Sequence, residues 1–359
     1  GTLNSATELA FVYYRVYQIL YSLHIMGLIS AVFQGITTTQ FFLYGRKRFT
    51  ATGWEEASKA YKPGQLENAD LHAKVYMVTG ANGGIGRDVA EYLASKGSTV
   101  YMVCRDKGRG EKAKADIVEK TRNEKVNVLL GDCGLQKDVR RVMTEFGIKE
   151  KRLDGLVCNA GALLNEKTLT EEGVEVTFAT HLLYGSYLMS QLATPYLKEA
   201  AEPRVVMVSS GGMYNTKFPT WEMATATSSQ AYDGQLAYAY AKRGQVLLCE
   251  RLAEAEKSVK YVTCHPGWTD TPGVTATYGD QKKYLQPMRS MYQGSEGISW
   301  LCMAPAAELE SGAFYLDRKP RRKHLSGVFF TEGSFTKNEE SETDQLMAKL
   351  QEWAETPGK

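Results

Sequence analysis

Between Lys74 and Gly86 the chain reads KVYMVTGANGGIG, a short apolar run followed at once by a glycine-rich loop. The apolar run predicts a buried parallel strand, and helical periodicity over residues 84–96 predicts a helix directly after the loop. Glycines such as Gly80 and Gly84 let the backbone turn sharply and approach a phosphate closely. The N–H groups and positive end of the helix would then face that phosphate. This strand–loop–helix context predicts a dinucleotide-binding unit.

The alternation of strands and helices continues downstream of this unit. Strand-like apolar runs and helical periodicity follow one another at regular spacing, which predicts a doubly wound parallel α/β sheet of the Rossmann type with right-handed crossovers. The expected strands are residues 74–79, 99–104, 126–130, 155–159, 204–210, 259–264 and 314–316, and the expected helices are residues 84–96, 108–121, 136–146, 173–198 and 235–256.

Composition and charge narrow the class of protein. The chain has 359 residues, of which 43% are hydrophobic and 23% charged, as in ordinary globular proteins. Its 43 Lys and Arg and 41 Asp and Glu give a net charge of +2, which excludes nucleic acid as an expected partner. The six cysteines form no CxxC pair and mostly lie in apolar runs, so we expect buried free thiols in an intracellular reducing compartment and no metal site. They are Cys104, Cys133, Cys158, Cys249, Cys264 and Cys302.

The N-terminal part contains an unusual charge-free stretch. No Asp, Glu, Lys or Arg occurs from Val16 to Gly45, and a basic triplet follows at residues 46–48. About 20 apolar helical residues suffice to cross a bilayer, so one interpretation is a membrane span. The alternatives are an interfacial or partner-binding helix and a helix packed on the protein's own core. We expect residues 1–48 to form an apolar helical extension that contacts a membrane or a partner protein through residues 9–45.

The remaining boundaries follow from shifts in composition. A lead-in segment spans residues 49–73, and the Rossmann domain, as a single core domain, spans 74–330. A polar tail covers 331–359. Within the tail, helical spacing over 342–354 places apolar residues on one side, which predicts an amphipathic docking helix. The apolar residues are Leu346, Leu350 and Trp353.

Polar residues follow the predicted second, third and fourth strands. In sites selective for NAD an acidic residue stands about 20 positions past the glycines. Here that place is taken by Arg105, with Asp106 beside it. A guanidinium can pair with a 2′-phosphate, so we expect NADP rather than NAD. A carboxylate at Asp132 can accept a hydrogen bond from an adenine amino group, and residues 159–161 read Asn-Ala-Gly at another carboxyl end.

A hydroxyl, a phenol and an amine suggest redox chemistry. Ser210 follows the fifth strand, and Tyr238 and Lys242 stand four residues apart on a predicted helix, so they share one face. An ammonium near a phenol favours the phenolate and lowers its pKa. The serine can hold a carbonyl oxygen while the tyrosine donates or removes a proton. Tyr240 has no lysine four residues on and is not expected to take part.

These motifs occur in an order that resembles the short-chain dehydrogenase/reductase family. The fingerprint TGxxxGxG spans residues 79–86, and the NAG motif, the serine and the YxxxK pair follow it. Within the family the chain is similar to the retinol-dehydrogenase-like group, through residues 208–213, 265–273, 317–320 and 49–61. The resemblance covers about residues 74–318 and implies an NADP-binding oxidoreductase.

The resemblance also implies a role for each matching residue. Tyr238 would be the general acid/base, Lys242 would bind the nicotinamide ribose and tune the tyrosine, and Ser210 would polarise the carbonyl. Arg105 would hold the 2′-phosphate, Asp132 the adenine and Asn159 the adenosine side. The other implied cofactor-binding residues are Gly80, Asn82, Gly84, Ile85, Gly86, Ala160, Gly161, Pro266, Gly267 and Thr271, the last of which would meet the nicotinamide amide.

One position departs from the family pattern. The family usually carries a catalytic Asn on the helix after the fourth strand, and His181 stands there in this chain. Imidazole can form hydrogen bonds and carry protons, so we include His181 among the catalytic residues. A histidine on an apolar helix can equally be a core residue, and activity would then be reduced or lost.

Two functional hypotheses follow. The first is an NADP-dependent, membrane-associated oxidoreductase that interconverts a carbonyl and an alcohol on a retinoid, a steroid or a lipid-like substrate. An insertion after Ser210 would supply the apolar pocket through Met213, Tyr214, Phe218, Trp221 and Met223. The second is a cofactor-binding subunit with little turnover in a larger complex. The protein would be a homodimer or such a subunit, and its organelle (mitochondrion, plastid or the cytosolic face of the endoplasmic reticulum) is left open.

Overall fold

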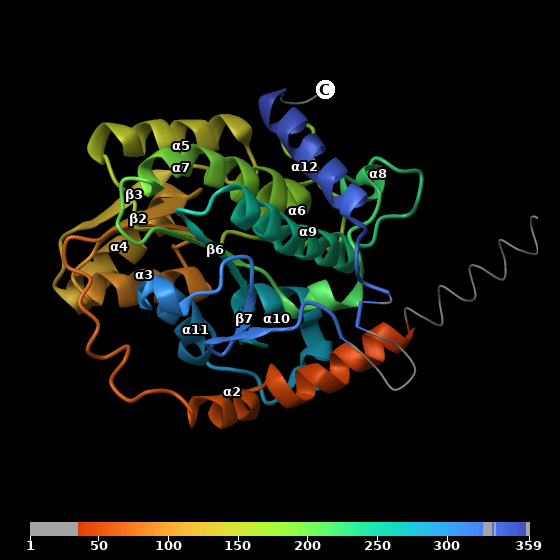
Figure 1. Ribbon diagram of the computed structural model, residues 1–359, viewed down its shortest axis with the longest axis horizontal. Coiled ribbons are helices and arrows are strands. Elements are labelled where there is room, and N and C mark those ends of the chain that lie inside the picture. Colours follow the sequence, from red (N-terminus) through yellow and green to blue (C-terminus); the bar gives the residue numbers. More distant parts are fainter. Residues whose placement is uncertain (1–34, 326–331, 334, 357–359) are drawn as a thin grey trace, which may run out of the picture.

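The computed structural model describes residues 35–325, 332–333 and 335–356. Within them the chain builds an eight-stranded sheet with the order β3-β2-β1-β4-β5-β6-β7-β8 (Figure 1). Neighbouring strands from β3 to β7 are parallel, and β8 pairs antiparallel with β7. This confirms the predicted Rossmann-type fold. The strands are β1 Val75–Thr79, β2 Thr99–Cys104, β3 Val126–Leu130, β4 Gly155–Cys158, β5 Arg204–Val208, β6 Lys260–Cys264, β7 Phe314–Leu316 and β8 Lys319–Arg321.

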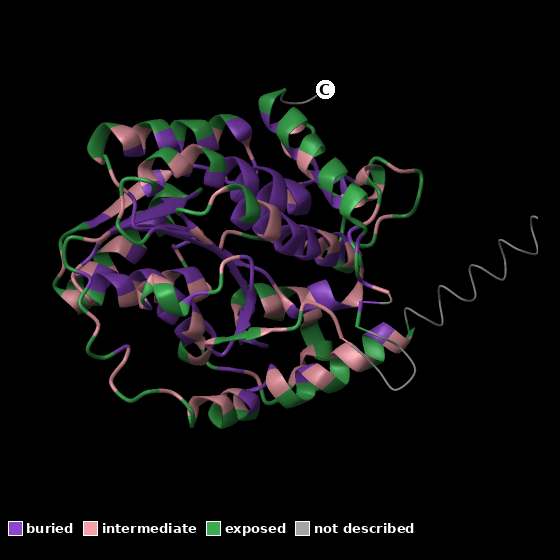
Figure 2. Ribbon diagram, in the orientation of Figure 1, coloured by how far each residue is buried: buried purple, intermediate pink, exposed green. Residues whose placement is uncertain are grey.

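Helices cover both faces of the sheet. Successive strand residues point to opposite faces, so in β1 Met77 joins one core and Val78 joins the other. Figure 2 shows the strands buried between the two helical layers, which explains their nearly continuous apolar sequences. One layer contains α3 Gly84–Ser95, α4 Lys107–Thr121 and α11 Met291–Met303, and the other contains α5 Gln136–Lys149, α7 Met189–Leu197 and α9 Gly234–Ala255.

The strand order reverses between β1 and β4. β2 and β3 lie on one side of β1, whereas β4 to β8 lie on the other. In open α/β sheets the crevice outside the carboxyl ends of the strands at such a switch point is where ligands bind. The predicted glycine loop follows β1, so the fold brings it to this crevice.

The helix expected over residues 173–198 is continuous but not uniformly α-helical. It consists of α6 Val176–Phe178, a π-helical segment η1 Ala179–Leu188 and α7. All ten residues of η1 are buried. Because a fully buried helix has no polar face, apolar periodicity does not reveal how many residues form each turn. The expected strands at 155–159 and 204–210 are also shorter, and end at Cys158 and Val208.

Helix α11 was not predicted, although its start carries a signal. Ser290 and Gln293 form a capping box in which each side chain bonds the other's backbone N–H. The sequence Ser-x-x-Gln is therefore the pattern that could have located this helix. The helices α2 Ala51–Ser58, α8 Trp221–Ala224 and α10 Pro272–Tyr278 were also not predicted.

The described part of the N-terminal extension is a helical segment at residues 35–48. Its Phe41 and Tyr44 pack on a third core that contains Phe49, Tyr214 and Trp268. Within residues 35–48, the helix thus lies against the protein's own core.

Residues 1–34, which carry most of the predicted apolar extension, lie outside the described residues. Among the helices that the structure describes, none combines the length and apolar character needed to cross a bilayer.

The predicted docking helix of the tail corresponds to α12 Glu340–Glu355. Leu346 and Leu350 are buried in the core next to η1 and α9, and Trp353 packs edge-on against Trp221 with the ring centroids 5.1 Å apart. Nε2 of Gln136 donates a hydrogen bond of 2.6 Å to the carbonyl oxygen of Ala354, near the end of the helix. The six cysteines are all buried and unpaired, which confirms the prediction of buried free thiols.

Candidate active site

The glycine loop joins β1 to α3 at the carboxyl edge of the sheet. Gly80 and Gly84 have φ angles of 66° and 55°, in the left-handed region that glycine adopts without strain. A Cβ on Gly86 would lie 2.3 Å from Nδ2 of Asn159, whereas a Cβ on Gly83 or Gly84 would meet no atom within 4 Å. The loop therefore leaves open space in front of the first turn of α3. The N–H groups of that turn have no intrahelical acceptor and can hold phosphate oxygens.

Thr79 and Asn159 lock the ends of β1 and β4 together. Oγ1 of Thr79 accepts hydrogen bonds from the N–H groups of Asn159 (3.0 Å) and Ala160 (2.9 Å). In return, Nδ2 of Asn159 donates to the carbonyl oxygen of Thr79 at 3.0 Å. The NAG motif thus supports the glycine loop from the adjacent strand. Its Gly161 allows a close approach, because a Cβ there would lie 1.9 Å from Cε1 of His181.

The ends of β2 and β3 present charged side chains. Arg105 follows β2 with 65% of its side chain exposed, and one guanidinium nitrogen lies 4.0 Å from a carboxylate oxygen of Asp132. Asp132 also accepts a hydrogen bond from the N–H of Gly134 at 2.8 Å. Asp106 caps α4 by accepting from the N–H of Arg109 at 2.8 Å. Asp106 is therefore engaged with its own helix, whereas the guanidinium of Arg105 is mostly exposed and approaches Asp132 only to 4.0 Å.

Ser210, Tyr238 and Lys242 converge on one cavity. Tyr238 and Lys242 lie on the same face of α9, with Nζ of the lysine 5.4 Å from the centroid of the phenol ring. Nζ donates a hydrogen bond of 2.6 Å to the carbonyl oxygen of Val208 at the end of β5. Ser210 follows the same strand, and its Oγ accepts a bond of 3.2 Å from the N–H of Gly212.

The surroundings of Tyr238 hold its proton in place, so the predicted lowering of the pKa of this phenol by Lys242 is not found. Burial raises the pKa of Tyr238 to about 12, and a hydrogen bond with Ser210 opposes that rise. Burial lowers the pKa of Lys242 to about 7, so its amine is partly charged at neutral pH. The phenol is therefore protonated in the free protein. A charged ammonium on the same face of the helix makes the loss of that proton easier.

His181 lies in the site rather than in a remote part of the core. Its ring packs edge-on against Tyr238, with the centroids 5.3 Å apart. Nε2 lies 2.8 Å from the carbonyl oxygen of Ala162, while Nδ1 is buried without a hydrogen-bond partner among the described residues. Burial and the neighbouring Lys242 hold the pKa of His181 well below its usual value, so the ring is neutral.

The loop after β6 supplies a further wall. Gly267 has a φ of 79°, and a Cβ there would collide with the side chain of Arg289. Thr271 caps α10 by accepting a hydrogen bond of 3.2 Å from the N–H of Val274. Helix α10 and the 3-10 segment η3 Gly279–Leu285 come next in the chain and form one side of the cavity.

His265 is a candidate that sequence reasoning missed. It directly precedes Pro266, lines the cavity and is only 6% exposed. Neither ring nitrogen has a hydrogen-bond partner in the described structure. Phe49 packs edge-on against the ring at 4.3 Å between centroids. Burial and the charge of Arg289 hold the pKa of His265 well below its usual value. The signal that could have identified it is its place immediately before the Pro-Gly pair.

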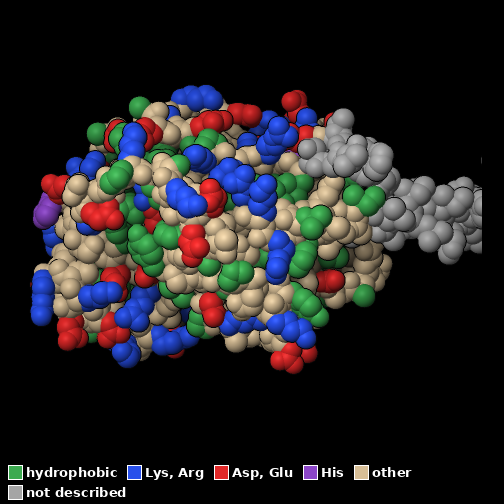
Figure 3. Space-filling view, turned by 90° about the horizontal axis from the view of Figure 1, so that it is seen from below, with side chains coloured by type: hydrophobic (Ala, Val, Ile, Leu, Met, Phe, Trp, Pro, Cys, Tyr) green, Lys and Arg blue, Asp and Glu red, His purple; other side chains and the backbone are tan. Residues whose placement is uncertain are grey.

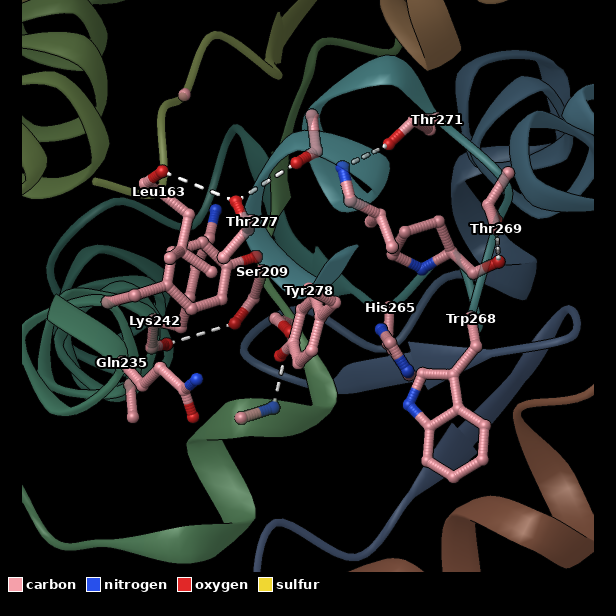
Figure 4. A pocket seen from close by; sticks show the side chains of 18 of the residues that line it. Leu163, Ser209, Gln235, Lys242, His265, Trp268, Thr269, Thr271, Thr277 and Tyr278 are labelled. Atoms are coloured by element: carbon pink, nitrogen blue, oxygen red, sulfur yellow. Dashed lines mark hydrogen bonds between the residues drawn. The ribbon is translucent and has the colours of Figure 1, made fainter. Parts of the chain in front are cut away.

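The cavity has a volume of about 580 Å³. Figure 4 shows side chains from α9, the β6 loop and α10 pointing into it, among them Lys242, His265, Trp268 and Tyr278. Its apolar lining includes Phe41, Phe42, Trp268 and Leu285.

The prediction that apolar side chains of the insertion after Ser210 line the pocket is wrong. The cavity lining contains none of the five predicted residues, Met213, Tyr214, Phe218, Trp221 and Met223. Gly212 and Asn215 of the same insertion do line the cavity, whereas these five side chains lie elsewhere. Tyr214 is buried in the third core, and Phe218 and Trp221 line a separate groove beneath α12.

The predicted site residues fall into two sets. The residues that line the cavity are Ile85, Asn159, Gly161, His181, Ser210, Tyr238, Lys242, Pro266, Gly267 and Thr271. The remaining ones lie outside the cavity lining, in the loops that follow β1 to β4 or in the first turn of α3. They are Gly80, Asn82, Gly84, Gly86, Arg105, Asp132 and Ala160. The first set offers a hydroxyl, a phenol and an amine, and the second offers glycines, free N–H groups and one exposed guanidinium.

Both sets fit a phosphorylated dinucleotide. The space that a Cβ at Gly83 or Gly84 would fill can receive a pyrophosphate at the N-terminus of α3. The exposed guanidinium of Arg105 suits a 2′-phosphate. The cavity beside Tyr238 is large enough for a nicotinamide and part of a substrate.

Comparison with known proteins gives consistent matches. The family model for short chain dehydrogenases matches residues 74–282. Dehydrogenase/reductase SDR family member 12 of Bos taurus is 40% identical to this chain over 286 residues, which cover 79% of this chain and 89% of that protein. Retinol dehydrogenase 12 of Homo sapiens is 35% identical over 202 residues, which cover 56% of this chain and 63% of that protein.

Solved structures share the fold. The crystal structure of L-sorbose reductase from Gluconobacter frateurii, complexed with NADPH and L-sorbose, matches with a TM-score of 0.55 and 22% identity. The match covers 69% of this chain and 95% of that chain. At this level of identity the likeness shows the architecture of the sheet and its helices, and nothing of the substrate.

Proposed function

The chain belongs to the short-chain dehydrogenase/reductase family, and on this premise we propose that it is an NADP-dependent oxidoreductase that interconverts a carbonyl and an alcohol on an apolar substrate. The observation that carries the proposal is the convergence of Ser210, Tyr238 and Lys242 on one cavity with apolar walls. A retinoid, a steroid or a lipid-like molecule is the substrate class that such walls favour.

Residues at the carboxyl edge would hold the cofactor. Gly80, Gly84 and Gly86 give the pyrophosphate access to the N–H groups of α3, and Arg105 pairs with the 2′-phosphate. Asp132, Asn159 and Thr271 complete the contacts that the family motifs imply. Similarity to an NADPH-complexed fold and the exposed guanidinium of Arg105 support NADP as the cofactor. The bound nicotinamide supplies or accepts the hydride.

The protein's own residues would handle the proton. Ser210 donates a hydrogen bond to the carbonyl oxygen and fixes its position. Tyr238, which is protonated at neutral pH, donates its proton to that oxygen when a carbonyl is reduced and takes it back when an alcohol is oxidised. The ammonium of Lys242 stabilises the phenolate that remains. His181, neutral and against the phenol ring, would accept or donate a hydrogen bond through Nδ1, which its neighbours leave free.

The decisive experiment compares two tyrosines on one helix. NADPH oxidation by the purified chain is followed with a panel of apolar aldehydes and ketones, and Tyr238→Phe is compared with Tyr240→Phe. We expect Tyr238→Phe to lower kcat/KM by about 100-fold or more, because general acid–base catalysis contributes at least that much. Tyr240 is outside the cavity lining, so its variant should retain activity.

The outcomes separate the two functional hypotheses. Retained activity in Tyr238→Phe contradicts the catalytic assignment. If the chain binds NADPH but turns over no carbonyl, the second hypothesis, a cofactor-binding subunit of a larger complex, is supported instead. Size-exclusion chromatography with light scattering then distinguishes a homodimer from a subunit that needs partners.

We also propose that the N-terminal extension contacts a membrane or a partner protein, in an intracellular reducing compartment. The charge-free stretch at residues 16–45 supports this, as does Leu43, which is 64% exposed in its described part. Figure 3 views the molecule from below, the side on which this segment lies in Figure 1, and hydrophobic side chains there alternate with Lys, Arg, Asp and Glu. Vesicle flotation of the full chain, compared with a chain that lacks residues 1–34, tests the membrane contact.

A further inference from the structure

The helical segment at residues 35–48 reaches the candidate active site. Thr38, Phe41 and Phe42 line the same cavity as Tyr238 and Ser210. The segment thus places an exposed threonine at the cavity, together with two phenyl rings that follow it three and four residues later. This contact joins a part of the chain that precedes the Rossmann domain to the catalytic hydroxyl groups, which lie about 200 positions later in the sequence.

Aromatic packing holds the segment against the β6 loop. The rings of Phe41 and Phe42 lie 6.3 Å and 6.0 Å from the ring of Trp268, measured between centroids. Gly45 makes the close approach possible, because a Cβ there would lie 2.4 Å from Cζ2 of the same tryptophan. Phe49, which is fully buried, packs edge-on against Trp268 with the ring centroids 5.7 Å apart.

A buried arginine fixes the end of the segment. Arg289 pairs with Asp317 through two hydrogen bonds of 2.7 Å and 2.9 Å, and both side chains are 2% exposed. The same guanidinium donates to the carbonyl oxygens of Arg48, Phe49 and Thr50. These hydrogen bonds fix the backbone at residues 48–50, where the segment ends. The position of the segment over the cavity is therefore set by the fold.

We propose that Phe41 and Phe42 form the outer wall of the substrate pocket and determine the length and width of substrate that it accepts. The hydrocarbon part of the substrate would lie between these rings and Trp268, while its carbonyl group reaches Ser210 and Tyr238. This inference rests on the proposed oxidoreductase function. It assigns substrate selection to the N-terminal segment, outside the region that the family model matches.

The test uses adjacent residues of the same helix. Phe42 lines the cavity, whereas Leu43 does not and is 64% exposed. In the full chain, Phe42→Ala widens the pocket, Thr38→Trp narrows it, and Leu43→Ala and Thr39→Ala are the matched controls. Each variant is assayed for kcat/KM with hexanal and with decanal.

We expect Phe42→Ala to raise the ratio of decanal to hexanal kcat/KM by roughly tenfold, the usual effect of changing a hydrophobic pocket by a few carbons. Thr38→Trp should lower the same ratio, and both controls should keep the wild-type ratio. Unchanged ratios in both lining variants would overturn the proposal. Because Thr38 and Phe42 are exposed, neither substitution removes a core side chain, and thermal melting verifies that the variants are folded.

A binding measurement separates this proposal from the proposed function. The dissociation constants of 1-hexanol and 1-decanol are measured by calorimetry with the NADP-loaded protein and its variants. One outcome is that the Phe42→Ala and Thr38→Trp variants shift the preference between the two alcohols in opposite directions while no aldehyde is turned over. This result would support the proposed pocket wall and contradict the proposed catalysis. If the alcohols bind all variants equally, the wall is contradicted whatever the activity.

Discussion

The cofactor edge and the substrate wall of this protein are built in different ways. The cofactor edge, at residues 79–86, 105, 132 and 159–161, is made of short motifs that directly follow strands of one sheet. The substrate wall combines residues 38–49 with the loop after β6, and a buried Arg289 holds the two together. The cofactor edge therefore depends on local backbone shape, whereas the substrate wall depends on contacts between distant segments.

This difference indicates how each region can vary. A glycine that needs a left-handed φ or a close approach tolerates few replacements, so the cofactor edge is restricted position by position. The substrate wall needs a ring of suitable size at Phe41 or Phe42 and a fixed entry point at Phe49. Substrate preference can therefore change while the cofactor edge stays the same. Each prediction below perturbs one region and uses the other as its reference.

The largest effect on stability is expected at the arginine clamp. Asp317→Asn leaves the guanidinium of Arg289 buried without its counter-charge, which costs roughly 3–5 kcal/mol in a buried pair. Asparagine adopts the left-handed region readily, so the φ of 55° at this position should not add to the loss. Urea unfolding measures the stability, and hydrogen exchange over residues 35–50 should rise while NADPH affinity is retained.

An exposed ion pair gives the matched control for the clamp. Asp344 pairs with Arg251 at 2.9 Å but is 70% exposed, so Asp344→Asn should change stability by less than about 1 kcal/mol. Equal losses in the two variants would show that the burial of the Asp317 pair has no special role. If Asp317→Asn lowered the affinities for NADPH and for substrate equally, the cofactor edge and the substrate wall would not be independent of each other.

Lys242 lies where the two regions meet, and its titration affects folding. Its pKa is about 7 in the folded protein and 10.5 ordinarily, so between these values the unfolded chain binds more protons. Stability should therefore rise with pH over this range, with a slope of up to about 1.4 kcal/mol per pH unit from this group. In Lys242→Met that contribution disappears. Unfolding of both proteins at the two ends of the range measures the difference.

A surface lysine serves as the reference for the pH experiment. Lys112 on α4 has 75% of its side chain exposed, so Lys112→Met should keep the slope of the wild type. A slope in Lys242→Met equal to that of the wild type would mean that the buried amine does not titrate as its surroundings imply.

The glycine loop offers a test of local backbone shape. In Gly86→Ala the new methyl group would lie 2.3 Å from Nδ2 of Asn159 and 2.6 Å from the carbonyl oxygen of Gly80. Overpacking of this kind costs typically 1–3 kcal/mol, and the displaced loop should bind NADPH less well. Gly297→Ala, in α11, is the control, because the nearest atom to its Cβ would be a backbone nitrogen 3.9 Å away, an ordinary contact outside the glycine loop. Thermal melting and NADPH fluorescence titration distinguish the two, and similar behaviour would contradict the steric argument.

Sequence reasoning named Ser210, Tyr238 and Lys242, which the structure brings to one cavity, and the residues of the cofactor edge, whose roles stay predictions. It did not predict the phenyl rings of the substrate wall, for physical reasons. Gly80, Tyr238 and Lys242 belong to motifs whose spacing places them on one turn or one helix face. The contact between Phe42 and Trp268 has no such local signature. The orientation of the insertion that holds Trp221 depends on α12, which folds back from the end of the described chain.

The smallest effect is expected at the edge of the cofactor site. Arg105→Ala should weaken NADPH binding by about tenfold, the loss of one charge-assisted contact with a phosphate, and should leave NADH binding unchanged. Arg109 is exposed to a similar degree, at 61%, but it stands on α4 rather than at the end of β2, so Arg109→Ala is the control. Fluorescence titration with both cofactors measures the preference. An equal loss for NADPH and NADH would contradict selection at the 2′ position.

The π-helical segment η1 has a consequence for how this domain tolerates changes in length. A π-helical stretch accommodates an added residue inside a helix without moving the segments on either side. Deleting one residue between Ala179 and Leu188 would therefore tighten part of this segment toward α-helical geometry and leave α6 and α7 in their present orientations. Met189 and Leu197 would stay in the core, so a change of one residue in chain length is tolerated better within η1 than within α7, where it would rotate the rest of the helix by roughly 100°.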